Sequence, residues 1–319
     1  MKTKTIINLK LMNMKKKLLI LFVMCGLAMV SQATTLRVNN TDPSAPYASI
    51  NDAVNAATEG DTIMVEGSSI PYGDVTINKR VVLIGPGYWL KENGIVTETG
   101  YSATVKTLTS TEAGTVIMGM SSNYRFEIKG AKTIIKKCNI NSANYYSIYL
   151  STGADNCVIT QNYLSQGIGG NDKDDNKTFR HQITNNIVNK MELWYVYDSY
   201  VGYNTILHSW DIAWDQAGNK MERNLVQGSD ISQKNTIAKQ NTFVDNYFAG
   251  SLFKNISTDK DVLEYDIPDE AKAYGAFAGD NPYVISGIPA GPIIEELTIP
   301  TSAEEGSSME VAIKLGTVK

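Results

Sequence analysis

The stretch Ile159-Thr160-Gln161-Asn162-Tyr163-Leu164 decides the fold of this chain, because an asparagine followed by apolar or β-branched residues recurs at intervals of 17 to 24 residues. Aligned on this asparagine, the position three residues earlier is apolar in five of six copies. The position two residues earlier is never apolar. Such alternation is typical of a strand and not of a helix. The six asparagines are Asn139, Asn162, Asn186, Asn204, Asn224 and Asn241.

A unit of about 20 residues with short strands cannot bury its own apolar face, so the copies must stack on one another. Each strand then bonds to the coil above and the coil below, and proline is excluded. The nine prolines leave residues 87–267 free of proline. Asparagine suits the sharp turns of such coils, because it tolerates left-handed backbone and its amide can bond to the amide one coil away. Chance periodicity in a polar sequence is the alternative, and the coincidence of the three features favours stacking.

A short helix and three strands are predicted before the repeats. Residues 47–57 form an amphipathic pattern in which Ile50, Val54 and Ala57 share one face, and Gly60-Asp61 ends it. We expect this helix to cover the open end of the first coil, where unpaired edge groups would otherwise be exposed. The strands are predicted at 62–66, 75–78 and 81–85, separated by glycine and proline.

The segments Ala48-Ser49-Ile50-Asn51-Asp52-Ala53, Gly60-Asp61-Thr62-Ile63-Met64-Val65 and Val82-Leu83-Ile84-Gly85 resemble the opening of right-handed parallel β-helix proteins of the pectin-lyase-like superfamily. The resemblance covers roughly residues 47–255. It implies an all-β, right-handed parallel β-helix (solenoid) with an N-terminal helical cap and asparagine ladders. It implies no single activity, because the superfamily includes lyases, glycoside hydrolases, esterases and adhesins.

The first 33 residues have the three regions of a secretory signal peptide: lysines, the apolar run 18–30, and small residues ending at Ala33. The apolar run is too short to span a bilayer, so we expect export to the periplasm, cell surface or exterior without a transmembrane segment. The remainder carries a net formal charge of −10, which disfavours nucleic acid as a partner. It retains only Cys138 and Cys157, whose different offsets from the ladder position argue against direct stacking but leave a disulfide open.

The C-terminal segment is rich in Pro and Gly over 268–300, with strands expected at 293–299 and 309–315. It resembles the end region of secreted β-helix proteins of gut-type bacteria, which implies that it covers the last coil. A truncated start of an immunoglobulin-like domain is the alternative. The predicted organisation is a signal peptide at 1–33, an N-terminal cap at 34–60, a parallel β-helix at 61–255 and a C-terminal cap and tail at 256–319.

Residues 194–214 contain seven aromatic residues in 21 positions, interleaved with acidic residues. Aromatic faces stack on sugar rings and carboxylates accept hydroxyl hydrogen bonds, so this composition suits polysaccharide binding. Burial of these aromatic residues in the core is the alternative. Trp194, Tyr195 and Tyr197 include both odd and even positions of one strand, however, and successive strand residues point to opposite faces, so they cannot all point inward. The predicted substrate-binding residues are Trp194, Tyr195, Tyr197, Tyr200, Trp210, Asp211, Trp214 and Asp215.

Catalytic and metal-binding candidates are weaker. Arg180, Asp198 and Lys137 are the candidates for a lyase or a hydrolase, but nothing in the sequence fixes their distances. We expect an exposed ion pair between Arg180 and Asp198, and a partly buried, hydrogen-bonded role for His181. The loop 169–177 lacks the glycine and distal glutamate of an EF-hand, so a solvated loop is favoured over calcium binding and no cofactor is predicted. Its potential calcium ligands are Asp172, Asp174 and Asn176.

The sequence therefore favours an exported β-helix protein that binds polysaccharide or a cell-surface glycan without catalysis. A polysaccharide lyase or glycoside hydrolase using the same flank is the first alternative. A structural protein of the cell envelope, which would need no site, is the second.

Overall fold

The computed structural model describes residues 33–95, 99–143, 146–170, 177–211, 216–230, 232, 240–249, 267, 269–289, 291–298 and 312–318. For residues 209–211, 291–298 and 312–318 only the backbone is described. The predicted signal peptide, apart from Ala33, and the candidate calcium ligands Asp172, Asp174 and Asn176 lie outside these residues.

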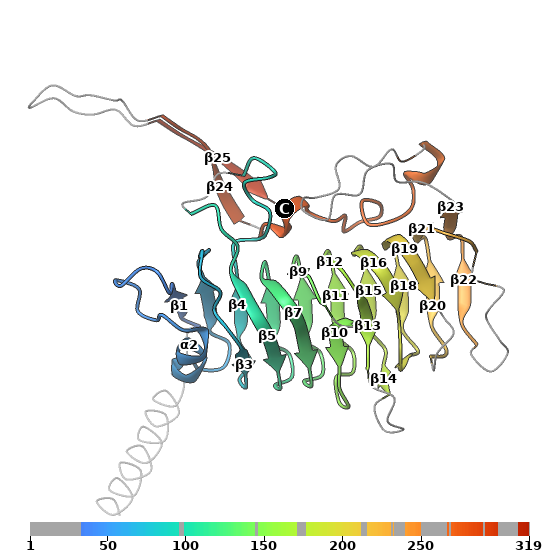
Figure 1. Ribbon diagram of the computed structural model, residues 1–319, viewed down its shortest axis with the longest axis horizontal. Coiled ribbons are helices and arrows are strands. Elements are labelled where there is room, and N and C mark those ends of the chain that lie inside the picture. The colour runs from blue at the N-terminus through green and yellow to red at the C-terminus, as the bar shows by residue number, and fades with distance from the viewer. Residues whose placement is uncertain are drawn as a thin grey trace, which may run out of the picture. The chain divides into compact units, whose positions relative to one another are not determined.

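The described residues form a parallel β-solenoid of about eight turns, which confirms the predicted fold class (Figure 1). A ten-stranded sheet, which we call sheet A, contains one strand from each successive coil. Its strands in spatial order are β1 (Thr35–Val38), β2 (Thr62–Val65), β4 (Val82–Ile84), β6 (Val116–Met118), β8 (Ile134–Lys136), β11 (Val158–Thr160), β15 (Gln182–Thr184), β18 (Tyr200–Gly202), β20 (Lys220–Glu222) and β22 (Thr242–Val244).

An eleven-stranded sheet, sheet B, forms the other side of the coils. Register shifts after Val105 and Val188 bend its long strands, so that one strand contributes to two faces of a coil. A two-stranded sheet of β14 (Thr178–Phe179) and β17 (Val196–Tyr197) lies at a corner of the stack. Sheet B comprises β3 (Val75–Ile77), β5 (Thr104–Ser110), β7 (Ser121–Ile128), β9 (Asn139–Ile140), β10 (Tyr146–Leu150), β12 (Tyr163–Leu164), β13 (Gly167–Gly169), β16 (Ile187–Glu192), β19 (Thr205–Asp211), β21 (Leu225–Gln227) and β23 (Tyr247–Ala249).

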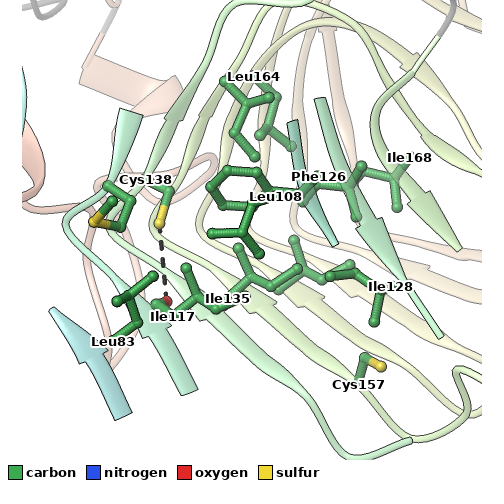
Figure 2. Packing of buried hydrophobic residues seen from close by; sticks show 14 of the residues in the cluster. Leu83, Leu108, Ile117, Phe126, Ile128, Ile135, Cys138, Cys157, Leu164 and Ile168 are labelled. Atoms are coloured by element: carbon green, nitrogen blue, oxygen red, sulfur yellow. Dashed lines mark hydrogen bonds between the residues drawn. The ribbon is translucent and has the colours of Figure 1, made fainter. Parts of the chain in front are cut away.

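The core is built from columns of identical position, because the parallel register places the same strand position of each coil over the next. In sheet A, Ile135 pairs with Ile159, which pairs with Ile183, and all three are fully buried. Figure 2 shows this packing, with the side chains of Phe126 and Leu108 meeting inside the coils. Apolar burial of about 25 cal/mol per Å² makes this continuous column the main stabilising element of the fold.

The predicted asparagine ladder runs along the turn between sheet A and sheet B. Each side-chain Nδ2 donates to the Oδ1 of the next asparagine at 2.8–3.0 Å, and each Oδ1 also accepts the backbone N–H one coil back. All the buried polar atoms of the side chain are thereby bonded, which removes the cost of burying an amide. The ladder consists of Asn162, Asn186, Asn204, Asn224 and Asn246.

Two of the six predicted ladder residues, Asn139 and Asn241, do not belong to the ladder. Cys138, and not Asn139, holds the ladder position in its coil, where its N–H donates to Asn162 Oδ1 at 2.9 Å. Asn241 belongs to a second file at the turn that precedes sheet A, where its Oδ1 accepts the N–H of Asn219 at 3.0 Å. This second file continues through Asn219, Ser199, His181 and Cys157, each accepting a backbone N–H from the coil before or donating to the coil after.

The N-terminal elements match the sequence prediction closely. The helix α2 (Ile50–Ala56) begins with Ser49 as its N-cap, whose Oγ accepts the Asp52 N–H at 3.4 Å. It contacts β1, β2 and β3 and buries Ile50, Ala53 and Val54. Tyr47, which the prediction included in the helix, instead forms a parallel bridge with Val38.

Residues 269–289 lie along the ladder turn and run from later coils toward earlier coils. Gly275 N–H donates to Arg223 O at 3.0 Å, Asn185 Nδ2 donates to Ala278 O at 2.8 Å, and Gln161 Nε2 donates to Pro282 O at 2.6 Å. We call this segment the strap. The sequence predicted that the C-terminal segment covers the last coil. The strap instead continues along the earlier coils as far as Tyr88, whose N–H donates to Ser286 O. Beyond it, β24 (Gly291–Thr298) and β25 (Ala312–Val318) pair antiparallel.

The strap contacts the residues that precede the ladder position. These residues all have left-handed backbone, with φ between 49° and 58°. Five of them hydrogen-bond to the strap through a side chain or a carbonyl, and the ring of Tyr203 lies next to Gly279 of the strap, so the outer side of the ladder turn is covered. They are Lys137, Gln161, Asn185, Tyr203, Arg223 and Asp245.

Candidate functional site

The structure distributes the predicted aromatic cluster over three faces of the coils. Trp194 contacts Tyr146 of β10, with ring centroids 5.8 Å apart. The ring of Tyr197 lies tilted against that of Phe179 of β14, with centroids 5.5 Å apart, and Tyr200 lies on sheet A. Only the backbone is described for Trp210 and Asp211, and Trp214 and Asp215 lie outside the described residues. Tyr195 occupies a left-handed turn with φ of 62°.

The Tyr200 side chain is held in place by Gly202 on its own strand and by Glu222 on the next strand of sheet A. Its ring lies along its strand over Gly202, where an added Cβ would be 2.5 Å from the hydroxyl oxygen. Partial burial, and then the carboxylate of Glu222, raise the pKa of Tyr200 to about 12. The hydroxyl hydrogen-bonds to Glu222, so this tyrosine has a structural partner on sheet A.

The catalytic candidates do not converge. Arg180 and Asp198 hold the same left-handed turn position in successive coils, but the predicted pair between them does not form. The Arg180 guanidinium instead contacts the preceding coil, at 3.4 Å from Asp155 Oδ2 and 3.2 Å from Asn156 Oδ1. Lys137 lies on the opposite, ladder turn.

Lys137 is enclosed by the strap. Its residue is 4% exposed, and its Nζ donates to Ile288 O at 3.1 Å. Burial, and then the neighbouring Lys136, lower its pKa. The ammonium group is therefore used to fasten the strap to the ladder turn.

The buried titratable groups of the interior, His181, Cys138 and Cys157, also have structural roles. His181 is fully buried and its Nδ1 accepts the Cys157 N–H at 3.3 Å, as the sequence predicted for this residue. Burial lowers the pKa of His181 to about 4, so the ring is neutral near pH 7. Cys138 and Cys157 are both free and buried, and lie well apart in Figure 2. Burial raises the pKa of each thiol to about 12, which makes both unreactive.

A different set of aromatic and charged side chains gathers on the outer face of sheet B, over β7, β10, β13 and β16. We call it the aromatic-charged face. The rings of Tyr146 and Tyr149 have centroids 5.8 Å apart, and Trp194 meets Tyr146 edge-on. Its members are Tyr124, Arg125, Glu127, Tyr146, Tyr149, Lys190, Glu192 and Trp194.

Two glycines explain why these rings meet. Tyr146 and Trp194 belong to coils that are separated by the coil of β13. In β13, Gly167 pairs with Tyr146 and Gly169 with Tyr149, and neither has a side chain to separate the neighbouring coils. A Cβ at Gly169 would be 2.6 Å from the carbonyl oxygen of Trp194, so glycine is required there. The two rings therefore extend over the backbone of β13 and touch each other.

The charges of this face pair with one another. Arg125 forms an ion pair with Glu127, and Lys190 forms an ion pair with Glu192. The Arg125 guanidinium also lies 5.2 Å from the ring centroid of Tyr124 and 5.3 Å from that of Tyr149, within cation–π range. Arg125 thus fixes the orientation of two of the rings.

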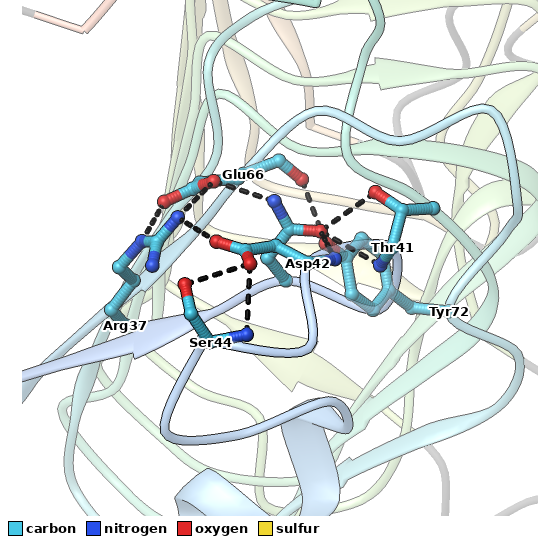
Figure 3. Close-up of polar contacts among 7 residues, drawn as sticks. Arg37, Thr41, Asp42, Ser44, Glu66 and Tyr72 are labelled. Atoms are coloured by element: carbon cyan, nitrogen blue, oxygen red, sulfur yellow. Dashed lines mark hydrogen bonds and ion pairs between the residues drawn. The ribbon is translucent and has the colours of Figure 1, made fainter.

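A polar network near the N-terminus is the other conspicuous cluster (Figure 3). Arg37 pairs with Glu66 and with Asp42 at 2.7 Å, while Asp42 Oδ1 accepts from Ser44 Oγ at 2.7 Å and its N–H at 2.8 Å. The Ser44 bonds, followed by Arg37, lower the pKa of Asp42 to about 2. Hydrogen bonds within the cluster occupy these charged groups, so the network ties the N-terminal loop to the first coils.

Most of the aromatic-charged face was not predicted from the sequence. Tyr124, Tyr146 and Tyr149 lie 45 or more residues before Trp194, and the coil lengths that bring them together are not visible in the sequence. The pair Gly167 and Gly169 is the signal that could have indicated the face, since two glycines in a strand mark a close approach of backbone.

No family model, curated protein or solved structure matches this chain. The parallel β-solenoid is shown by its own strand register, whereas membership of the pectin-lyase-like superfamily remains a resemblance of the sequence. Among the described residues, no cluster of three or more His, Cys, Asp or Glu side chains could hold a metal ion. In the same part of the chain, no helix has the length and apolar character needed to span a bilayer.

Proposed function

We propose that this protein is a non-catalytic saccharide-binding protein that is exported and acts at the cell envelope or outside the cell. The observation that carries the proposal is the grouping of Tyr146, Tyr149 and Trp194 over the side-chain-free backbone of β13. Aromatic rings offer apolar faces to the C–H groups of sugars, and the fixed backbone of a solenoid holds such rings without further loss of entropy on binding.

The charged groups beside the rings support binding of a hydroxyl-rich ligand. Glu127 and Glu192 present acceptors, and Arg125 and Lys190 present donors, next to the aromatic surface. A few placed polar groups among aromatic side chains are what fixes the orientation of a bound sugar. Export and the pectin-lyase-like membership belong to this proposal, supported by the N-terminal 33 residues and by the opening segment of the β-helix.

Binding without turnover is proposed because the sequence-predicted catalytic residues lie on different turns. The two carboxylates of the aromatic-charged face are each engaged by a cation, which leaves neither in the isolated state that a general acid requires. A lyase or hydrolase would release unsaturated or reducing ends from its polysaccharide, so the same samples can be assayed for both.

The test is affinity electrophoresis and calorimetry of the full chain with soluble polysaccharides. We expect Tyr149→Ala to weaken binding about tenfold, because an aromatic contact contributes about 1 kcal/mol beyond its buried area. Tyr101→Ala is the matched control, since Tyr101 is 44% exposed and stands outside the aromatic-charged face. Equal affinity of the wild type and Tyr149→Ala would remove the face from the proposal, and release of new sugar ends would replace binding by catalysis.

A further inference from the structure

We infer that the ligand of the aromatic-charged face is an uncharged glycan, and that Glu192 accepts a hydrogen bond from one of its hydroxyl groups. This inference rests on the proposed saccharide-binding function and narrows the class of ligand. It is carried by two observations: the internal pairing of all the described charges on the face, and the burial of the Glu192 carboxylate.

Among the described residues of the face, every cation already has an acidic partner, so none is in reserve for an acidic sugar. Recognition of a uronate or a sulfate requires an Arg or Lys that is free to form charge-assisted hydrogen bonds. Here Arg125 is engaged by Glu127 and lies against two aromatic rings, and Lys190 is engaged by Glu192. An incoming anion would have to displace a carboxylate that is already placed, on a chain whose residues after 33 carry a net formal charge of −10.

Lys106, on the adjoining strand β5, is also paired. Its Nζ lies 3.7 Å from Asp74 Oδ2. In the register of sheet B, Thr107 is aligned with Arg125 and Thr109 with Glu127, so hydroxyl groups border the face on that side. Across the face, Asp211 is aligned with Glu192 in the next coil. The described charges at the face therefore balance in pairs and produce no net positive field that would attract a polyanion.

Glu192 is the group with an open bonding position. Its residue is 5% exposed, its side chain 6% exposed, and its Oε1 is paired with Lys190. Its Oε2 is buried and has no hydrogen-bond partner within the described structure. A buried carboxylate oxygen is normally bonded, so a native structure that leaves one open calls for a donor from outside the chain. The Nε of Arg125 is likewise buried without an acceptor.

The open acceptor of Glu192 on β16 and the open donor of Arg125 on β7 are separated by β10 and β13, so each matches a different hydroxyl group of one sugar chain. A hydroxyl group can serve either of them, because it both donates and accepts. An anion would satisfy only the donor and would be repelled by Glu192. The Lys190 side chain, which is 41% exposed, pairs with Oε1, and a sugar hydroxyl would bond to Oε2 of the same carboxylate. This assigns hydroxyl recognition to Glu192.

The test compares neutral polysaccharides with their own carboxymethylated derivatives, so that only charge differs. Full-length protein is measured by affinity electrophoresis against dextran, xylan and mannan, each beside its carboxymethylated form. We expect at least one neutral polymer to bind, its carboxymethylated form to bind at least tenfold more weakly, and the neutral affinity to be unchanged between 50 mM and 500 mM salt, since no ion pair with the ligand is screened.

Glu192→Gln sharpens the test. The amide is nearly isosteric, so we expect the fold to be retained by circular dichroism while affinity for the neutral polymer falls about fivefold and the discrimination against the carboxymethylated form decreases. Glu92→Gln, at an exposed carboxylate away from the face, should change neither quantity. A merely structural Glu192 would alter affinity for both polymers by the same factor and leave the ratio unchanged.

The outcomes separate the two levels of the proposal. Binding of neutral polymers that is lost in Tyr149→Ala supports both. Tighter binding of a carboxymethylated polymer, or a ratio unaffected by Glu192→Gln, overturns the inference and leaves saccharide binding intact. Absence of binding to either polymer of every pair overturns the saccharide-binding function itself, and the inference with it.

Discussion

The ladder turn and the aromatic-charged face are built from the same coils but use them in opposite ways. At the ladder turn, successive coils place the same residue type at the same position, and Asn162, Asn186 and Asn204 bond to one another in a file. On the aromatic-charged face, successive coils place different residues, with Tyr149, Gly169 and Trp194 aligned in three consecutive coils. Repetition provides the architecture, and departure from repetition provides a surface that can recognise a ligand.

The largest effect is expected from a substitution within the ladder. Asn186→Ala removes a side chain that bonds to Ile159 O, to Asn204 Oδ1 and to the N–H of Asn162. Because these partners stay buried without a bond, we expect unfolding free energy to fall by about 2 to 5 kcal/mol in urea titrations. Asn123→Ala, at an exposed position, should change it by less than about 0.5 kcal/mol. Similar losses at both positions would show that the ladder has no special role in stability.

A pH-dependent effect is expected from the second file. The pKa of His181 is lowered to about 4 in the folded state and is about 6.5 when unfolded. The unfolded state therefore binds more protons between these values, and stability decreases as the pH falls from about 6.5 to about 4. The loss should be on the order of 3 kcal/mol at pH 4.

His181→Asn tests this effect, because asparagine already holds the same position in the coil of Asn219. We expect the variant to fold and to lose the stability change between pH 6.5 and pH 4, as followed by urea unfolding at several pH values. A variant with the pH profile of the wild type would assign the dependence to other groups. The carboxylates of Asp42 and Glu66, whose pKa values are lowered, begin to lose their contribution only as the pH falls through their unfolded values of 3.8 and 4.5, at the acidic end of this range.

A smaller loss of stability is expected from a substitution of Asn185, which precedes the ladder residue Asn186 in the chain. Asn185 bonds through Nδ2 to Ala276 O at 3.1 Å and to Ala278 O at 2.8 Å, and so holds the strap and not the core. We expect Asn185→Ala to lower unfolding free energy by about 1 to 2 kcal/mol. The diagnostic measurement is hydrogen exchange, which should become faster in 275–283 while the strands of the coils keep their protection. Faster exchange throughout the coils would mean that the strap and the core unfold together.

The smallest effect is expected at the corner that carries Arg180. The Arg180 guanidinium lies 3.4 Å from the Asp155 carboxylate, and the two side chains are 56% and 30% exposed. Such exposed pairs contribute about 0 to 1 kcal/mol. A double-mutant cycle should give a small favourable coupling for Arg180 with Asp155 and none for Arg180 with Asp198, measured from the midpoints of urea unfolding. Coupling to Asp198 instead would contradict the observed geometry.

The contrast between the two regions also explains what could be predicted from the sequence. The solenoid was predictable because its constraints repeat: an amide in each turn, alternation in each strand, and no proline over 87–267. The errors arose where the repetition is broken. Cys138 replaces asparagine at the ladder position, so the prediction wrongly placed the adjacent Asn139 there. Asn241 is an asparagine, but it belongs to the second file and not to the ladder.

The aromatic-charged face could not be predicted in the same way. Local enrichment of aromatic residues pointed to 194–214, yet a chain that turns every few residues sends Trp194, Tyr197 and Tyr200 to different faces. Side chains that meet across coils are separated by one or two coil lengths in the sequence. Without the exact number of residues in each coil, their alignment cannot be deduced.

The course of the strap has a mechanical consequence. Tyr88 and Tyr283 are joined through their hydroxyl groups although 195 residues separate them, and the strap between these points runs against the direction in which the coils are added. Tension applied beyond Pro289 would therefore load the contacts with Lys137 and Tyr88 first, then those with Gln161 and Asn185, releasing them one after another. The strap would lengthen by peeling, and the stacked rungs would bear force only after the last of these fastenings had opened.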